Sequence, residues 1–290
     1  MGPDSKDPKR VPPALPSTLV GCAGWSLSSQ DSSSFASAGS HLERYARVFP
    51  CVEINSSFYR SHQAKTYARW AASVPDTFRF CVKLPRTITH ESRLRQPEEA
   101  LRAFLDEVAA LEHKLGCILI QLPPSLALDA RQARRFFSVL RRCTSVPAAC
   151  EPRHSSWFTP QGAALLRDAG VACVRAHPSP LAGAEPLGDP AMLYVRLHGA
   201  PHMYYSAYDE AFIAAVAARI REARDENRAV WCIFDNTAGA AAIPNALELM
   251  QSLSRYVLEV GGASRDGVVL RRIARGRSPA TNSPLPPPRC

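Results

Sequence analysis

The chain has 290 residues, of which 46% are hydrophobic and 21% are charged, and it carries a formal net charge of +9. This composition is typical of a globular protein with a large core, and no run of about 18 apolar residues occurs that would span a membrane. The first residues, MGPDSKDPKR, lack the apolar segment of a secretory signal, so we expect a cytoplasmic protein with no membrane partner.

In the first half of the chain, short apolar runs rich in β-branched residues predict strands. A Ser-rich stretch at 28–40 predicts a loop. Apolar residues at helical spacing over 101–115 predict a helix. The strands expected in this half are 19–24, 51–55, 78–84 and 117–122.

The second half repeats this alternation of strands and helices. Thr159 followed by Pro160 predicts the start of a helix, and further helices are expected at 212–220 and 245–260. Eight strands alternating with helices predict a TIM-type (β/α)8 barrel of parallel strands with outer helices. An open, doubly wound sheet is the alternative, but GCAGWS only weakly approximates the expected GxGxxG turn. The strands expected here are 148–153, 171–176, 193–199 and 230–236.

The basic charge is concentrated at the carboxyl end, where 264–290 hold six arginines and one aspartate. We therefore expect three parts: a disordered N-terminal segment at 1–17, the barrel domain at 18–263, and a basic Pro/Arg-rich tail at 264–290. Such a tail attracts polyanions without selecting a sequence, so it gives little support to specific nucleic-acid recognition.

Nine cysteines are spread along the chain without a CxxC pair, which argues against zinc and redox motifs. Most of them fall in or beside a different expected strand. We interpret them as small packing residues in a reducing cytoplasm.

Polar residues occur near the carboxyl end of six expected strands. Side chains alternate between the two faces of a strand, and in a barrel one face meets the helices while the other meets the interior. Val52 and Ile54 are apolar, which places Glu53 and Asn55 on the interior face. Because barrel enzymes build their sites at this end, we expect a shared polar mouth. The same alternation assigns interior positions to Lys83, Gln121, Glu151, Arg153, Arg196, His198 and Asn236.

Seven blocks of the sequence resemble, in the same order, those of the YecE-like proteins, a family whose domain is of unknown function. The blocks are CAGWS, VEINSSFYR, FRFCVKLPRTITH, KLGCILIQLPPS, EPRHSSW, YVRLHG and FDNTAGAAAIPNA. The resemblance extends over 19–249, most of the chain. It implies a TIM-barrel fold, and it implies no particular reaction.

The expected mouth predicts a hydrolase that acts on a small anionic substrate, either a phosphorylated compound or a phosphodiester. Glu53, Glu151 and His198 would transfer protons, with Lys83 as a further catalytic group. Arginine forks match phosphate, aromatic rings stack on bases or sugars, and helix starts such as the one after Asn236 hold phosphate. The expected substrate-binding residues are Asn55, Tyr59, Gln121, Arg153, Trp157, Arg196 and Asn236.

Several alternatives stay open at this point. Glu53 and Glu151 can pair with the basic residues as a purely structural ion network, flank a glycosidic bond, or bind a divalent metal together with His198. Lys83 can form a Schiff base if burial and nearby cations lower its pKa. No cofactor is evident. The chain can also be a non-catalytic protein that binds a ligand or nucleic acid, and the pattern indicates no oligomeric state.

Overall fold

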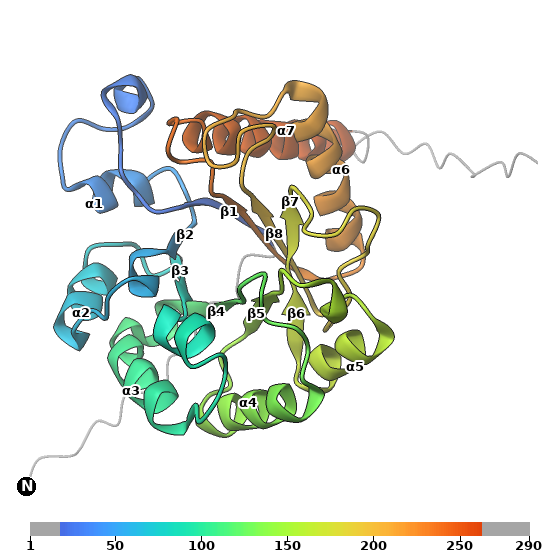
Figure 1. Cartoon of the computed structure of the whole chain (residues 1–290). Helices are drawn as coiled ribbons and strands as arrows, with labels where there is room; N and C mark the ends of the chain where they lie inside the picture. Colours follow the sequence, from blue (N-terminus) through green and yellow to red (C-terminus); the bar gives the residue numbers. More distant parts are fainter. Residues whose placement is uncertain (1–17, 263–290) are drawn as a thin grey trace, which may run out of the picture. The chain divides into compact units, whose positions relative to one another are not determined.

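The structure is a computed structural model that describes residues 18–262. Within this range the chain forms nine parallel strands in a single sheet, and Figure 1 shows them at the centre of a ring of helices. The strands are β1 (Thr18–Ala23), β2 (Cys51–Ile54), β3 (Arg79–Lys83), β4 (Leu115–Gln121), β5 (Ala148–Glu151), β6 (Val171–Cys173), β7 (Arg175–His177), β8 (Met192–Leu197) and β9 (Ala229–Phe234).

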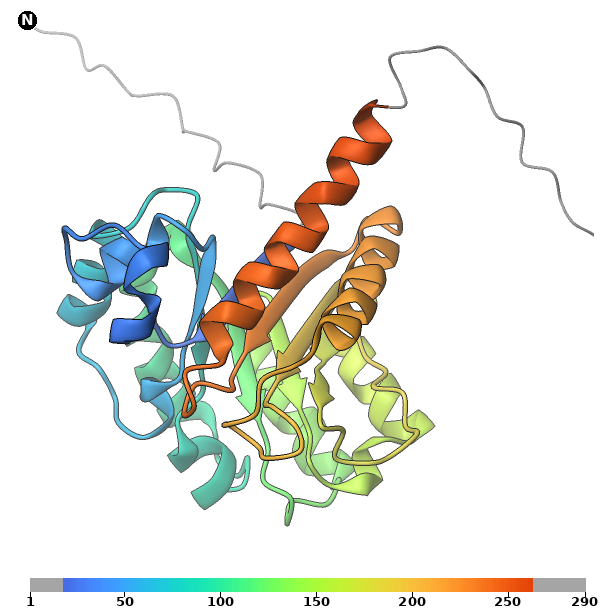
Figure 2. The ribbon, with the colours of Figure 1, turned by 90° about the horizontal axis from the view of Figure 1, so that it is seen from above.

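Helices cover the outside of the sheet and connect most successive strands; β6, β7 and β8 follow one another without a helix. The described residues up to Ser254 form one compact unit that holds all of these strands. Figure 2 shows α6 alongside β9, against which it packs. The α-helices are α1 (His41–Ala46), α2 (Ala64–Ala72), α3 (Glu98–Val108), α4 (Ala130–Cys143), α5 (Pro160–Asp168), α6 (Glu210–Asp225) and α7 (Ala242–Gly262). The 3₁₀ and π segments are η1 (Ser29–Ser34), η2 (Ser56–Phe58), η3 (Thr87–Glu91), η4 (Ala109–Lys114) and η5 (Ser155–Trp157).

The sheet curls into a nearly closed barrel, which confirms the predicted TIM-type fold. Strand order is β6-β5-β4-β3-β2-β1-β9-β8-β7. The sixth expected strand is split in two: β6 pairs with β5, and β7 pairs with β8. Val174 lies between the halves and still donates its N–H to the Cys150 carbonyl at 2.8 Å. The split allows one stretch of chain to change partners and so bring the two ends of the sheet together.

Alternating side chains form two buried clusters, one on each face of the sheet. The outer cluster packs under the helices and includes Val52, Val82 and Phe234. The inner cluster fills the barrel and includes Cys81, Leu119, Tyr194, Trp231 and Ile233. The predicted alternation is therefore confirmed for β2, β3, β4 and β8, but it is wrong for β9, where Phe234 faces outward and Ile233 faces the interior.

Local signals explain most of the helices. The Thr159 hydroxyl accepts a hydrogen bond from the Gly162 N–H at 3.3 Å, which confirms the predicted start of α5. The Ser-rich loop differs from the prediction because it contains η1. The Asp31 carboxylate accepts hydrogen bonds from both the N–H and the hydroxyl of Ser28, at 2.9 and 2.7 Å, and this stabilises the first turn.

Eight of the cysteines lie in the described part, all as free thiols, and six of them are buried. This confirms their role as packing residues. No helix between residues 18 and 262 combines the length and the apolar character needed to cross a membrane. The expected segments at 1–17 and 264–290 lie outside the described residues.

Candidate functional site

A buried arginine lies at the centre of the predicted mouth. Arg196, on the interior face of β8, is fully buried. Its Nε and Nη2 donate to the two carboxylate oxygens of Glu53 at 3.0 and 2.7 Å. Its Nη1 donates to Glu151 at 2.6 Å, and Nη2 also reaches Asp235 at 3.0 Å. One guanidinium thus connects β2, β5, β8 and the end of β9. The name Arg196 cluster is used below for five residues: Arg196, Glu53, Glu151, Asp235 and His198.

The cluster lowers the pKa of two of its carboxyl groups, Glu151 and Asp235. Burial alone would raise the pKa of Glu151, but Arg196, the hydrogen bond from His198 and the charge of Arg153 together hold that pKa well below its ordinary value. Burial also raises the pKa of Asp235, but Arg196 and His198 outweigh this effect, so the pKa is lowered. Arg196 itself has a raised pKa, because its three carboxylates outweigh the effect of burial. With its pKa held low, Glu151 is poorly suited to act as a general acid.

His198 is the group in the cluster best suited to proton transfer. It is fully buried, and its Nδ1 lies 3.0 Å from an oxygen of Asp235. Its Nε2 lies 3.1 Å from Glu151 and 3.0 Å from a guanidinium nitrogen of Arg153. Nε2 can either donate to Glu151 or accept from Arg153; in the second arrangement the imidazole proton lies on Nδ1 and faces Asp235. Asp235 then fixes the tautomer, as an orienting carboxylate does for a catalytic histidine.

Arg153 lies beside the Arg196 cluster and is more exposed than the members of the cluster. Its side chain is 12% exposed, whereas that of Arg196 is completely covered, and it also forms an ion pair with Glu151. Its Nε is buried without a hydrogen-bond partner in the described structure. Arg153 is therefore the more accessible of the two arginines.

Lys83 lies near the cluster but outside its ion pairs. It occupies the interior face at the carboxyl end of β3 and is 5% exposed. Its Nζ lies 4.1 Å from the ring centroid of Phe58, in η2. Burial first, and then the charge of Arg196, lower the pKa of Lys83 to about 8, although the three carboxylates act in the opposite direction.

Two residues in contact with Arg196 or Glu53, Asp235 and Tyr194, were not predicted from the sequence. Asp235 follows Ile233 on the interior face, so the wrong assignment of β9 hid it. Tyr194 shares the face of Arg196 and His198, a signal that the alternation in β8 already contained. Its hydroxyl donates to Glu53 at 3.0 Å and lies 3.1 Å from the Cys81 sulfur, which anchors the cluster to the inner core.

Of the remaining predicted residues, Asn55 and Gln121 lie at the ends of β2 and β4, whereas Trp157 and Tyr59 make other contacts. Asn55, directly after β2, has a buried side-chain oxygen without a partner in the described structure, and Gln121 ends β4 on the interior face. Trp157 is buried and donates its indole N–H to the Leu126 carbonyl at 3.0 Å, so it seals a loop. Tyr59 is 71% exposed and packs edge-on against Phe58.

Asn236 does not join the Arg196 cluster, because the alternation at the end of β9 turns it away from the interior. Its amide nitrogen donates to the Ser206 carbonyl at 3.0 Å and to the Asn245 side chain at 3.2 Å. Asn236 thus connects the loop after β8 to α7. The loop itself covers the cluster: the Tyr204 ring lies 5.8 Å from the His198 ring, edge to face.

The proposed metal ligands are occupied by side-chain partners. Glu53, Glu151 and His198 face Arg196, Arg153 and Asp235. Over residues 18–262 there is no group of three or more His, Cys, Asp or Glu side chains arranged to hold a metal ion. The geometry of the cluster is that of an ion-pair network around a guanidinium.

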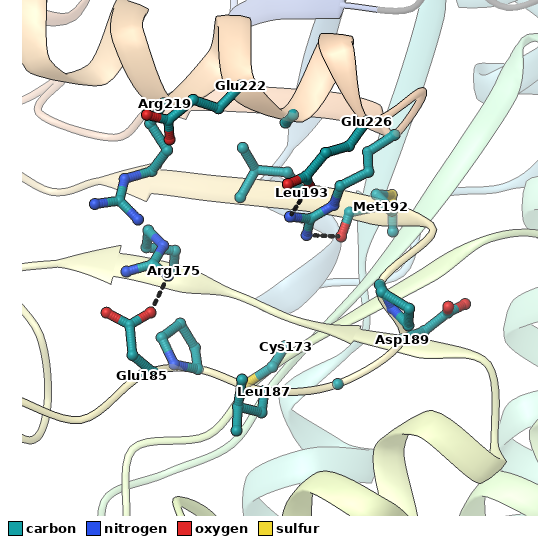
Figure 3. A pocket seen from close by; sticks show the side chains of 15 residues that line it. Cys173, Arg175, Glu185, Leu187, Asp189, Met192, Leu193, Arg219, Glu222 and Glu226 are labelled. Carbon is teal, nitrogen blue, oxygen red and sulfur yellow. Dashed lines mark hydrogen bonds and ion pairs between the residues drawn. The ribbon is translucent and has the colours of Figure 1, made fainter. Parts of the chain in front are cut away.

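Three of the cavities among the described residues lie away from the cluster. The largest of the three, of about 400 Å³, lies beside α1 and α2. Another, of about 320 Å³, opens beside the carboxyl ends of β1 and β9. The third, also about 320 Å³, lies between the β7–β8 connection and α6 (Figure 3). There, Arg175 pairs with Glu185, and Arg228 lies 3.6 Å from Glu226. None of these three linings includes a predicted site residue.

Known proteins of similar sequence cover most of the chain. Residues 19–265 match the family described as "Protein of unknown function DUF72". YunF of Bacillus subtilis is 24% identical over 81% of this chain and 94% of its own length. YecE of Escherichia coli is 39% identical over 82 residues, which are 28% of this chain and 30% of YecE. The alignment with YecE therefore spans less than a third of that protein.

Solved structures support the same fold. A DUF72 family protein of Enterococcus faecalis superposes with a TM-score of 0.70 at 23% identity, over 82% of this chain and 95% of the other. One from Thermotoga maritima gives a TM-score of 0.70 at 23% identity, over 82% of this chain and 99% of the other. With the family match over nearly the whole barrel, these likenesses lead to one conclusion: the chain belongs to the DUF72 family, that of the YecE-like proteins.

Proposed function

We propose that this chain is a hydrolase that acts on a small phosphorylated or phosphodiester substrate at the carboxyl end of the barrel. The observation that carries the proposal is the position of His198, held between Asp235 and Glu151 and in contact with Arg153. This arrangement combines an oriented imidazole with a guanidinium that can release it, which suits water-dependent cleavage of an anionic ester.

The reaction follows from the contacts of Arg153. A substrate phosphate draws the guanidinium of Arg153 toward itself, because Arg forms paired hydrogen bonds with phosphate oxygens. His198 Nε2 is then free to accept a proton from a water molecule. The water oxygen bonds to phosphorus, the bond to the leaving oxygen breaks, and the proton on His198 passes to that oxygen. Asp235 stabilises the imidazolium between the two transfers.

The other interior residues have supporting roles in this proposal. Arg196 fixes Glu53, Glu151 and Asp235 in place and so positions His198. Lys83 adds positive charge beside the bound anion while it is protonated. Asn55 and Gln121 offer amide groups to substrate oxygens. Tyr59 and Tyr205, which are 71% and 63% exposed, are available to contact the rest of the substrate.

The proposal is tested by the turnover of a panel of phosphomonoesters and phosphodiesters by the full-length chain. On any substrate that is cleaved, His198→Asn is expected to lower kcat by about 10²–10⁴-fold, the usual contribution of general acid–base catalysis. Arg153→Gln is expected mainly to raise KM. The control is His113→Asn, since the His113 side chain is 37% exposed and lies on η4.

Two results would count against hydrolysis. Unchanged kcat in a folded His198→Asn variant would remove the proton-transfer role. Phosphate binding that depends on Arg153, without turnover of any panel member, would favour the non-catalytic binding protein.

A further inference from the structure

Lys83 is a buried amine that the ion pairs of the mouth leave out. The three carboxylates of the Arg196 cluster all contact Arg196, and Glu151 contacts Arg153 as well. Within residues 18–262, Lys83 Nζ makes no ion pair or hydrogen bond, and its nearest described partner is the face of Phe58. Lys83 therefore has no acid in direct contact with it, and in the neutral amine the nitrogen lone pair is not taken up by a hydrogen bond.

We infer that Lys83 is a nucleophile that captures the carbonyl group of a small anionic aldehyde or keto acid as an imine at the barrel mouth. The inference goes beyond phosphoester hydrolysis and does not depend on it. The neutral Nζ attacks the carbonyl carbon, so a C–N bond forms as the carbon–oxygen π bond breaks. The oxygen takes one proton from Nζ and a second from solvent and leaves as water. The protonated imine remains, and no oxidant or reductant is needed.

The protonation state of Lys83 suits this attack. Burial, followed by the charge of Arg196, lowers its pKa to about 8 from an ordinary value of 10.5. Near pH 8, Lys83 therefore offers about a hundred-fold more neutral amine than an exposed lysine does. Desolvation beside a second cation is a known means of activating a lysine nucleophile.

Neighbouring groups can assist both steps. Lys83 Nζ lies over the face of the Phe58 ring, and the centre of the His90 ring is 4.9 Å from the centre of that ring. Nδ1 of His90 is 2.9 Å from the Thr89 hydroxyl. Burial and the charges of Lys83, Arg86 and Arg153 lower the pKa of His90 and keep its imidazole neutral. A neutral imidazole at this position can carry the protons that loss of water requires. Arg153 is placed to bind the carboxylate of the carbonyl compound.

The chain has only five lysines, so the label on each of them can be measured separately. Full-length protein is incubated at pH 8 with glyoxylate and sodium cyanoborohydride, and the carboxymethyl adduct on each lysine is followed by peptide mass spectrometry. Lys65, which is exposed, and Lys114, whose Nζ donates to the Ala71 and Val74 carbonyls at 2.7 Å, are internal controls.

The expected result is labelling of Lys83 at least ten-fold faster than Lys65, with Lys114 the slowest of the three. Labelling of Lys83 at or below the rate of Lys65 overturns the inference. Acetaldehyde, which lacks a carboxylate, tests the preference for anions: the ratio of Lys83 to Lys65 labelling should be several-fold lower than with glyoxylate, and an equal ratio overturns the anionic part.

The two proposals for the mouth can fail separately. Phosphoester turnover is measured on the same protein samples. Rapid labelling of Lys83 without turnover would refute only the hydrolase proposal, and turnover without labelling would refute only the imine. Lys83→Arg, which keeps the charge but cannot form an imine, should remove the fast adduct and leave the labelling of Lys65 unchanged.

Discussion

Replacement of Arg196 by methionine is the most direct test of how the mouth is held together. The change removes four hydrogen bonds to three buried carboxylates. Each such bond to a charged group is worth about 1.5–3 kcal/mol, or about 6–12 kcal/mol for the four. Desolvation of the guanidinium, which methionine avoids, offsets several kcal/mol of that sum. We expect Arg196→Met to lower the free energy of unfolding by about 3–5 kcal/mol, as when a buried charge loses its partner.

The pH dependence gives this prediction a distinctive sign. In the native protein the folded pKa values of Glu151 and Asp235 lie below their ordinary values, so the stability that they contribute is present above pH 4.5 and is lost as the pH falls through the folded values. Without Arg196, burial raises these pKa values instead, so the penalty is greatest near neutral pH. The difference in unfolding free energy between the native protein and the variant should therefore shrink as the pH falls from 7 toward 4.5.

Urea denaturation of both proteins between pH 4.5 and 7 measures this difference. The matched control is Arg135→Met, which breaks an exposed pair: Arg135 lies 3.0 Å from Glu98, and their side chains are 63% and 39% exposed. That pair should contribute less than about 1 kcal/mol. If Arg196→Met costs no more than the control, or if its cost is the same at every pH, the cluster does not hold the mouth as described.

Three further predictions follow from single contacts, each read by urea denaturation. Tyr194→Phe should lose about 1–2 kcal/mol, because Glu53 loses a buried donor, and an unchanged midpoint would contradict this. Asn236→Ala should lose about 1–3 kcal/mol, because the Ser206 carbonyl and the Asn245 side chain lose their donor. Lys83→Met should be at least as stable as the native protein at pH 7. The folded pKa of Lys83 is depressed to about 8, so its charged form opposes folding below that pH, and the penalty fades as the pH rises from 8 toward 10.5. A Lys83→Met variant that is clearly less stable at pH 7 would show that the amine is paired.

The barrel could be predicted because each strand is marked in the sequence by its own short run of apolar, β-branched residues. All eight expected strands occur, and only the sixth is divided, since its two halves must pair with different neighbours. Most of the mouth followed from the alternation of side chains. Asp235 did not, because in VWCIFDN large apolar residues occupy both faces of β9: Trp231 and Ile233 fill the barrel, while Phe234 packs under the helices. When both faces are apolar, sequence alternation cannot say which one faces inward.

Contacts between residues on different strands could not be predicted from the sequence, for a different reason. Nothing in the order of residues says that the carboxylates of β2, β5 and β9 share one guanidinium, because that depends on how far the strands are staggered around the barrel. The stagger has a chemical consequence. Since Glu53 and Glu151 both pair with Arg196, the structure favours an ion-pair network over the free acid and base that a glycosidase requires.

The same allocation of charge explains why Lys83 and His198 are the reactive candidates in the mouth. Suppose that one carboxylate were released from Arg196 and approached Lys83. The amine would then stay protonated, and its pKa would rise toward the ordinary value, which would end its use as a nucleophile. Arg196 therefore affects Lys83 in two ways without touching it. Its positive charge lowers the pKa of the amine, and its hydrogen bonds keep the carboxylates away from Lys83, where they would raise that pKa. Any variant that loosens the Arg196 cluster should slow the labelling of Lys83 by glyoxylate even though the Lys83 side chain is intact.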